Sequence, residues 1–323
     1  MKEKHVARPV VEVSGLSRTF TVRKETVSAL RDVTFTLHEG EVVGLLGSNG
    51  AGKTTLTKIL SALLLPTGGS ARILGHDVVR HPRQVRERIG VIFGGETGLY
   101  DRLTGRENIR FFAMLNGVRR RQITERIAAA LDEVGLTGAA DRPVETYSKG
   151  MRQRLHIAIG TVHRPRVLLL DEPTIGLDPI EAERLRTAIG RLRDDGVSVL
   201  LTSHYLLDVE RLADRVLVLA DGTISGNMTT GEFARAAGYR AVVTVRARGK
   251  VPSELTDGGV GVLVDGIVED DDVWSARLRV QDWGPTSFAH LSRVLSDADV
   301  LDVDVAPVRL EDVYATLDLG GRR

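Results

Sequence analysis

The chain of 323 residues contains no cysteine, which excludes disulfides, thiolate metal sites and catalysis by a thiol. Only 4% of the residues are aromatic, so the core has to be built from aliphatic side chains. No apolar run approaches the roughly 20 residues that a membrane-spanning helix needs, and the polar N-terminal sequence MKEKHVARP contains no apolar signal segment. If the protein works at a membrane, we therefore expect a partner to span the bilayer.

The chain also lacks an excess of charge of either sign. Its 44 basic and 43 acidic residues give a formal net charge of +1, which argues against a protein whose main role is to neutralise nucleic-acid phosphates. Hydrophobic residues make up 42% of the chain, enough for a sizeable core. Because the chain is long for a single core, we expect two domains, at about residues 1–226 and 227–323.

In the first of these domains, short apolar runs alternate with helical patterns. Strands are expected at residues 41–47, 166–171, 197–203 and 215–220, and helices at 53–65, ended by Pro66, and at 179–195. Apolar strands separated by helices predict an α/β fold with a parallel sheet covered on both faces. The mainly helical segment at about 99–164 interrupts this alternation, and we interpret it as an inserted helical subdomain.

After about residue 226 the pattern becomes one of half-buried strands. Apolar and polar residues alternate at 241–248, 274–280 and 301–305, and helical spacing occurs at 286–297 and 310–317. These patterns predict a small α+β domain. We interpret the acidic run EDDD at 269–272 as a solvated loop rather than a metal site.

The sequence GSNGAGKTT, residues 47–55, carries the strongest chemical signal. It fits the pattern G-x-x-x-x-G-K-[ST], follows an expected strand and opens an expected helix. Glycines allow successive backbone N–H groups to surround an anion, and the N-terminus of the helix adds positive partial charge. Lys53 supplies a full charge for the β- and γ-phosphates, and Thr54 supplies a hydroxyl for Mg²⁺. The loop is therefore predicted to bind a nucleotide.

A second motif, RVLLLDEPT, places two acids at the end of a buried strand, where α/β sheets carry their ligand chemistry. Asp171 is a candidate to hold Mg²⁺ through water, and Glu172 a candidate general base for the attacking water.

Two weaker signals accompany these acids. Ser148 and Gly150 precede a helix and could contact an anion, although an ordinary helix cap would look the same. His204 follows a strand and could contact a γ-phosphate, although a single histidine is usually structural.

Together, these four motifs resemble the nucleotide-binding subunit of ABC transporters over about residues 10–226. Their order and spacing agree with that family throughout. The resemblance implies a P-loop NTPase fold and an ATPase that uses ATP and Mg²⁺. It identifies YSKGM with the family signature, usually LSGGQ, and His204 with the switch histidine. It implies nucleotide contacts for Phe20, Gly47, Ser48, Asn49, Gly50, Ala51, Gly52, Lys53, Thr54, Thr55, Ser148, Gly150 and Asp178.

Among these, Phe20 would stack on adenine, unless it is a core phenylalanine, and Asp178 ends the segment IGLD that is similar to the family's D-loop. The resemblance also implies a mechanism. Two subunits, expected to be identical, would bind head to tail, with each ATP between Lys53 of one subunit and the signature of the other. ATP would then stabilise only the closed dimer.

Departures from the family pattern narrow the subclass. The signature has Tyr147, Lys149 and Met151 where Leu, Gly and Gln are usual, and no glutamine follows the strand IGVIF. Glu96 is the nearest replacement for that glutamine, because its carboxylate can accept a hydrogen bond from a metal-bound water. These segments, and VRLEDVYATL near the C-terminus, resemble exporters of the sodium-exporting Nat type and the daunorubicin type, whose ATPase and membrane parts are separate chains.

We therefore expect an ATPase subunit on the cytoplasmic face of the membrane, contacting a permease through the region of about 94–102 and the helices after it, with no nucleic-acid partner. The alternative is a soluble ABC ATPase that acts on ribosomes or DNA. Translation-type relatives carry two cassettes and repair-type relatives long coiled coils, and this sequence has neither. A GTPase switch would need an NKxD-type guanine-binding motif, which is also missing.

Overall fold

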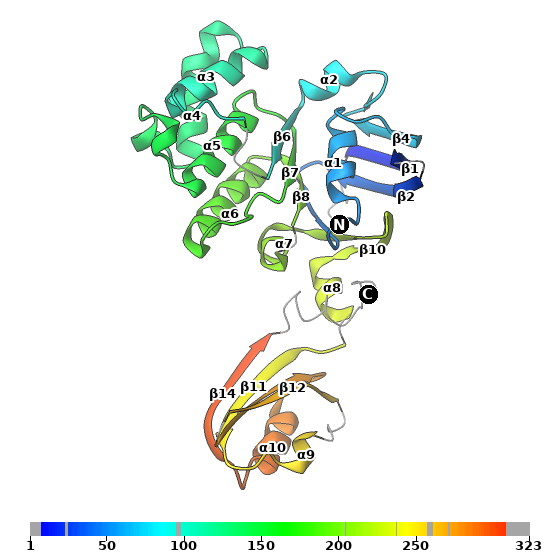
Figure 1. Ribbon diagram of the computed structural model, residues 1–323, viewed down its shortest axis with the longest axis vertical. Coiled ribbons are helices and arrows are strands. Elements are labelled where there is room, and N and C mark those ends of the chain that lie inside the picture. The colour runs from blue at the N-terminus through cyan, green and yellow to red at the C-terminus, as the bar shows by residue number, and fades with distance from the viewer. Residues whose placement is uncertain are drawn as a thin grey trace, which may run out of the picture. The chain divides into compact units, whose positions relative to one another are not determined.

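The computed structural model of the protein describes residues 8–22, 25–94, 98–203, 205–236, 238–256, 261–270 and 272–307 (Figure 1). The chain divides into two compact units, Met1–Thr229 and Thr230–Arg323. The first unit contains two sheets and the second unit one, and each unit has its own core.

A six-stranded sheet with the order β10-β9-β3-β8-β7-β6 forms the centre of the first unit. Its strands are β3 (Val42–Leu46), β6 (Ile89–Phe93), β7 (Val167–Asp171), β8 (Ser198–Thr202), β9 (Arg215–Ala220) and β10 (Thr223–Thr229). All of these strands except β10 run parallel, as expected. The strands β3, β7 and β8 are buried along their whole length. The edge strand β10 pairs with β9 in the antiparallel direction, because the short turn between them cannot form a crossover.

Helices cover both faces of this sheet. On one face lies α1 (Lys53–Leu60), with Leu56, Ile59 and Leu60 fully buried. On the other face lies α7 (Leu206–Leu212), so close to β3 that a Cβ at Gly44 would be 2.5 Å from the Val209 side chain. The helix α1 ends earlier than the expected residue 65, because Ser61 caps it and Ala62 adopts a left-handed backbone with φ of 55°.

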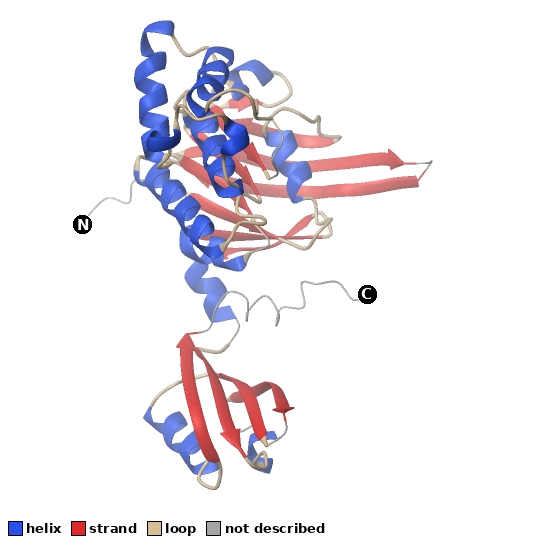
Figure 2. Cartoon of the chain, turned by 60° about the vertical axis from the view of Figure 1, so that its left-hand side comes forward, coloured by secondary structure: helices blue, strands red, loops and turns tan. Residues whose placement is uncertain are grey.

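An antiparallel sheet that the sequence pattern did not indicate packs on the other side of α1. It consists of β1 (Pro9–Val22), β2 (Glu25–His38), β4 (Gly68–Ile73) and β5 (His76–Asp77), in the order β2-β1-β4-β5, followed by the short helix α2 (Pro82–Arg86). Figure 2 shows β1 and β2 running together as a long ribbon. Its buried side chains join those of the six-stranded sheet in one core around α1.

The helical subdomain expected at 99–164 is present. It contains α3 (Gly105–Leu115), α4 (Ile123–Glu133), α5 (Lys149–Thr161) and the 3₁₀ turns Arg120–Gln122, Thr137–Ala139 and Val144–Thr146. A capping box starts α3: Thr104 accepts from the N–H of Glu107, whose carboxylate accepts from the N–H of Thr104. After β7, α6 (Pro179–Asp194) returns the chain to the sheet, one residue shorter than the expected helix.

The second unit is the small α+β domain that the alternating pattern predicts. It contains α8 (Thr230–Ala236), β11 (Ala241–Arg248), α9 (Ser253–Thr256), β12 (Val262–Asp270), β13 (Val273–Val280), α10 (Pro285–Val294) and β14 (Asp299–Pro307). The strands form an antiparallel sheet in the order β12-β13-β11-β14. Trp274, Ala276, Leu278 and Val280 all point into its core, as expected.

One expectation for this unit is wrong in part. Glu269 and Asp270 do not lie in a loop but end β12, opposite Trp274 and Val273, although both acids are exposed. No cluster of three metal-ligating side chains occurs within the described parts of the chain. The expected helix at 310–317 lies outside the described residues.

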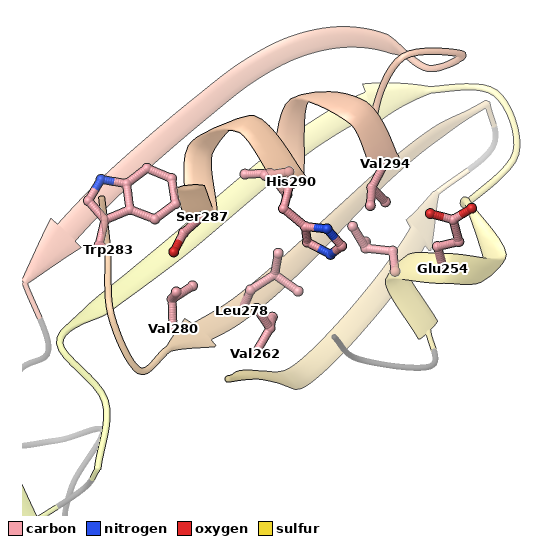
Figure 3. A pocket seen from close by; sticks show the side chains of 10 residues that line it. Glu254, Val262, Leu278, Val280, Trp283, Ser287, His290 and Val294 are labelled. Carbon is pink, nitrogen blue, oxygen red and sulfur yellow. The ribbon is translucent and has the colours of Figure 1, made fainter. Parts of the chain in front are cut away.

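A small cavity separates α10 from the strands beneath it. Figure 3 shows it lined by Val262, Leu278, Val280 and Val294, with Trp283 and His290 at its margins. Its volume is about 30 Å³, which is the space of one water molecule. It is therefore a packing defect in the core of the second unit rather than a ligand site.

Candidate active site

The loop between β3 and α1 has the backbone shape that anion binding requires. Gly50 and Gly52 have φ of 84° and 110°, in the left-handed region that favours glycine. A Cβ at Gly52 would lie 2.5 Å from the carbonyl oxygen of Ala29, so a larger residue would push the loop away from β2. Gly52 is followed directly by the first turn of α1, whose N–H groups have no partner within the helix.

Lys53 is held inside this loop. Its ammonium nitrogen donates to the carbonyl oxygens of Gly47 and Ser48 at 2.8 and 3.2 Å, and its side chain is 5% exposed. Burial lowers the pKa of Lys53, while the carboxylates of Glu172 and Asp171 oppose that shift. These contacts keep the cation at the centre of the loop before any phosphate arrives.

The two acids of the second motif lie at the end of β7, where Thr202 of the neighbouring strand β8 holds both. The hydroxyl of Thr202 donates to Asp171 Oδ1 at 2.5 Å, and the N–H of Glu172 donates to the carbonyl oxygen of Thr202 at 3.0 Å. Glu172 has φ of 51°, a strained conformation for a residue with a side chain. The backbone turn at Glu172 brings one of its carboxylate oxygens to 3.9 Å from Lys53 Nζ.

These groups surround one cleft of about 170 Å³. Its lining brings together most of the predicted loop with the predicted base: Ala29, Ser48, Asn49, Gly50, Gly52, Lys53, Thr54, Thr55 and Glu172. Thr54 is exposed at the cleft, and Ala51 is buried beneath the loop. Of the lining residues, the sequence analysis missed Ala29 of β2, whose methyl group carries no chemical signal.

The signature residues lie outside this cleft. Ser148 caps α5 by accepting from the N–H of Met151 at 3.2 Å, and it is exposed. Gly150 is buried against α6, where a Cβ would lie 2.3 Å from Glu181 Oε2. The unusual Tyr147 is a buried anchor whose hydroxyl donates to the carbonyl oxygen of Ala139 at 2.7 Å.

The D-loop lies next to the signature. Asp178 caps α6 by accepting from the N–H groups of Ile180 and Glu181 at 3.0 and 2.9 Å. Gly176 has φ of 68°, and a Cβ on it would lie 2.2 Å from Lys149 Nζ. The unusual lysine of the signature is thus packed against the D-loop of its own subunit.

Three further predicted site residues lie apart from the cleft or cannot be placed. Phe20 is half-buried near the end of β1, with the guanidinium of Arg18 4.5 Å from its ring centroid. It belongs neither to the cleft lining nor to the buried core of the first unit. His204 and Glu96 lie outside the described residues.

Sequence comparisons relate the chain to known ATP-binding proteins. Residues 30–175 match the family model described as ABC transporter. The ABC transporter ATP-binding protein NatA of Bacillus subtilis is 41% identical over 215 residues, 67% of this chain and 87% of that protein. The daunorubicin/doxorubicin resistance ATP-binding protein DrrA of Streptomyces peucetius is 36% identical over 313 residues, 95% of this chain and 92% of that protein.

Solved structures are similar to the first unit. A dimeric ATP-binding cassette in a post-hydrolysis state, bound to ADP and Pi, has a TM-score of 0.62 and 25% identity, covering 68% of this chain and 98% of its own. An ATP-binding subunit of an ABC transporter has a TM-score of 0.62 and 31% identity, covering 71% of this chain and 93% of its own.

Proposed function

The chain belongs to the ATP-binding, ATP-hydrolysing subunits of ABC transporters, and we propose that it powers export through a separate membrane permease. The observation that supports ATP hydrolysis as its source of power is the cleft that joins the loop around Lys53 to Glu172. No helix in the described ranges is long and apolar enough to cross a membrane. The proposed transporter uses a second kind of chain to span the bilayer.

In the proposed mechanism, the phosphates of ATP occupy the cleft and the chain's own groups neutralise them. The N–H groups at the start of α1 and the ammonium of Lys53 bind the β- and γ-phosphates. The oxygens of Thr54 and Asp171 suit Mg²⁺, which prefers oxygen ligands. When bound, this ion would offset phosphate charge during hydrolysis.

Glu172 is the proposed general base. Its carboxylate lies at the phosphate end of the cleft, near Lys53, where it can accept a proton from a water that attacks the γ-phosphate. The adjacent buried Asp171 stays in place through Thr202 and does not compete for that water. His204, next along the chain after Ser203, is proposed to contact the γ-phosphate, as the family resemblance implies.

The active unit is proposed to be a head-to-tail dimer of identical subunits. Ser148 and Asp178 are exposed and lie outside the cleft of their own subunit, so they are available to a second copy. The N-terminal N–H groups of α5 beside Ser148 suit an anion, as do those of α1. One ATP between these two helix ends would stabilise only the closed dimer.

The permease is proposed to dock on the helical subdomain. A groove of about 380 Å³ lies between α5, β6 and α3, and its apolar lining includes Leu63, Phe93, Phe112 and Ile159. Beside it, α3 exposes Met114 and Leu115 at 57% and 71%. An apolar groove with exposed apolar neighbours suits the apolar face of a helix from a partner.

Export is proposed from the relatives NatA and DrrA, and the expected location is the cytoplasmic face of the membrane. The test first asks whether a membrane protein is encoded next to this chain. The two are then co-expressed and purified through a tag on the chain. We expect a stable complex that hydrolyses ATP, and export assays with sodium and with anthracyclines then address the cargo. Copurification with nucleic acid or ribosomes, without a membrane protein, would contradict the proposal.

A further inference from the structure

A buried carboxylate outside the nucleotide cleft joins three segments around the proposed base. Asp208 lies in α7 and is completely buried. Its Oδ1 accepts from Arg186 Nε of α6 at 2.9 Å. Its Oδ2 accepts from the hydroxyl of Thr174 and from Ser203 Oγ, the latter at 2.9 Å. Ser203 Oγ also lies 3.1 Å from the carbonyl of Tyr205, but a carboxylate is the stronger acceptor.

This cluster is charged and its members depend on one another. Burial lowers the pKa of Arg186, but the hydrogen bonds from its guanidinium to Asp208 and Glu183 outweigh burial and raise the pKa overall. Thr174 and Ser203 are 3% and 1% exposed, so water cannot replace the carboxylate as their partner. A buried charge of this kind is tolerated only when it is paired and hydrogen-bonded.

The two hydroxyl donors follow the ends of two neighbouring strands, β7 and β8. Thr174 is two residues after Glu172, and Ser203 is the residue after Thr202. Thr202 itself binds the N–H of Glu172 and the carboxylate of Asp171. The strand end is thus attached to β8 through Thr202, and the loop after it is attached to α7 through Asp208.

We infer that Asp208 is a positioning residue for ATP hydrolysis, holding the loop after β7 so that the Glu172 carboxylate stays beside Lys53. The left-handed backbone at Glu172 persists only if the residues around it are fixed. Asp208 holds the loop after Glu172 through Thr174, and Thr202 holds the backbone of Glu172 at the end of the strand. This inference rests on the proposed role of Glu172 as the base.

The test uses the full-length chain with Thr174→Val, which keeps the side-chain shape and removes only the hydroxyl that reaches Asp208. Because displacement of a catalytic group by about 1 Å costs up to ~100-fold, we expect kcat to fall ~10- to 100-fold. Affinity for ATP, measured without turnover, should not change, because Lys53 and the loop are intact. Asp208→Asn should lower kcat as well, and the double variant should lose no more than the worse single one.

The matched control is Thr161→Val, which removes another buried threonine hydroxyl, one that donates to the carbonyl of Ile157 at 2.9 Å within α5. It should keep the wild-type kcat and melt at a similar temperature to Thr174→Val. An equal fall in kcat in the control, or a parallel loss of ATP affinity in Thr174→Val, would contradict the positioning role. Asp208 would then only stabilise the fold in general.

Glu172→Gln is measured in parallel so that two failures can be told apart. If Glu172→Gln still turns over, the assignment of the base is wrong. If Glu172→Gln is inactive while Thr174→Val and Asp208→Asn hydrolyse ATP at the wild-type rate, the base stands and the positioning role of Asp208 is refuted.

Discussion

The ammonium nitrogen of Lys53 lies 3.9 Å from a carboxylate oxygen of Glu172, although the two residues are 119 positions apart in the chain. The lysine is nearly buried at 5% exposure, whereas the glutamate side chain is 24% exposed and open to the cleft. The two charges attract each other when no phosphate lies between them. The cation and the proposed base therefore lie side by side in the cleft.

Replacement of the proposed base should separate binding from turnover. In Glu172→Gln the loop and Lys53 are unchanged, so ATP should bind, while kcat should fall by about 100-fold or more because the proton acceptor is lost. Size-exclusion chromatography with ATP should then show a dimer. Glu210→Gln, at an exposed position of α7, is the control with normal turnover. A monomer that persists with ATP bound would contradict the head-to-tail arrangement.

Replacement of the buried lysine should weaken nucleotide binding itself. Lys53→Ala removes a charge-assisted contact that contributes about 1.5–3 kcal/mol, so ATP affinity should fall roughly 10- to 100-fold. Isothermal titration calorimetry measures this change directly. Lys58→Ala, on the exposed face of the same helix, should bind ATP like the wild type. Unchanged affinity in Lys53→Ala would mean that the loop does not bind the phosphates.

A methyl group at Gly150 should block the dimer without affecting the cleft. It would lie 2.3 Å from Glu181 Oε2, and Glu181 is held by Arg154 and Arg184. Gly150→Ala should therefore displace the start of α5 and lower kcat at least about tenfold, while each subunit still binds ATP. The control is Gly190→Ala in α6, where a Cβ meets open space. An ATP-induced dimer of normal stability in Gly150→Ala would argue against the signature as an intersubunit contact.

Two histidines, His156 in α5 and His163 just after that helix, should make the first unit less stable in acid. Burial and the charge of Arg152 lower the pKa of His156 below its ordinary value of 6.5. Burial likewise lowers the pKa of His163, and its contact with the carbonyl oxygen of Ile89 opposes the shift only in part. Since the unfolded chain binds these protons first, stability is complete above pH 6.5 and falls as the pH is lowered. The slope should reach at most about 1.4 kcal/mol per pH unit for each histidine.

Chemical unfolding followed by circular dichroism between pH 7.5 and 5.5 measures that slope. Both tryptophans, Trp274 and Trp283, lie in the second unit, so their fluorescence reports on that unit separately. His163→Asn should reduce the slope of the first unit, and His81→Asn, at an exposed position, should not. A slope that is the same in all three proteins would show that His163 does not couple pH to stability.

The predictions from sequence succeeded where the signal lies within a few consecutive residues. The strand at 215–220 was predicted with its observed bounds, because an apolar run between polar neighbours has to be buried along its length. The long antiparallel ribbon of β1 and β2 was not predicted, because its local pattern is interrupted. Register shifts between Val13 and Leu16, and again between Leu16 and Arg18, break the alternation of polar and apolar residues that would have predicted β1.

The sequence by itself determined the phosphate-binding loop, because its glycines, lysine and threonines are contiguous and the backbone they prefer is local. Only the tertiary structure decided which distant residues complete the site. Ala29 closes the cleft, Thr202 holds the two acids, and Asp208 joins two helices to the loop after β7. Thr202 meets the two acids because neighbouring parallel strands end at one edge of the sheet. No pattern along the chain records which side chains meet at that edge, or that β2 and α7 approach it.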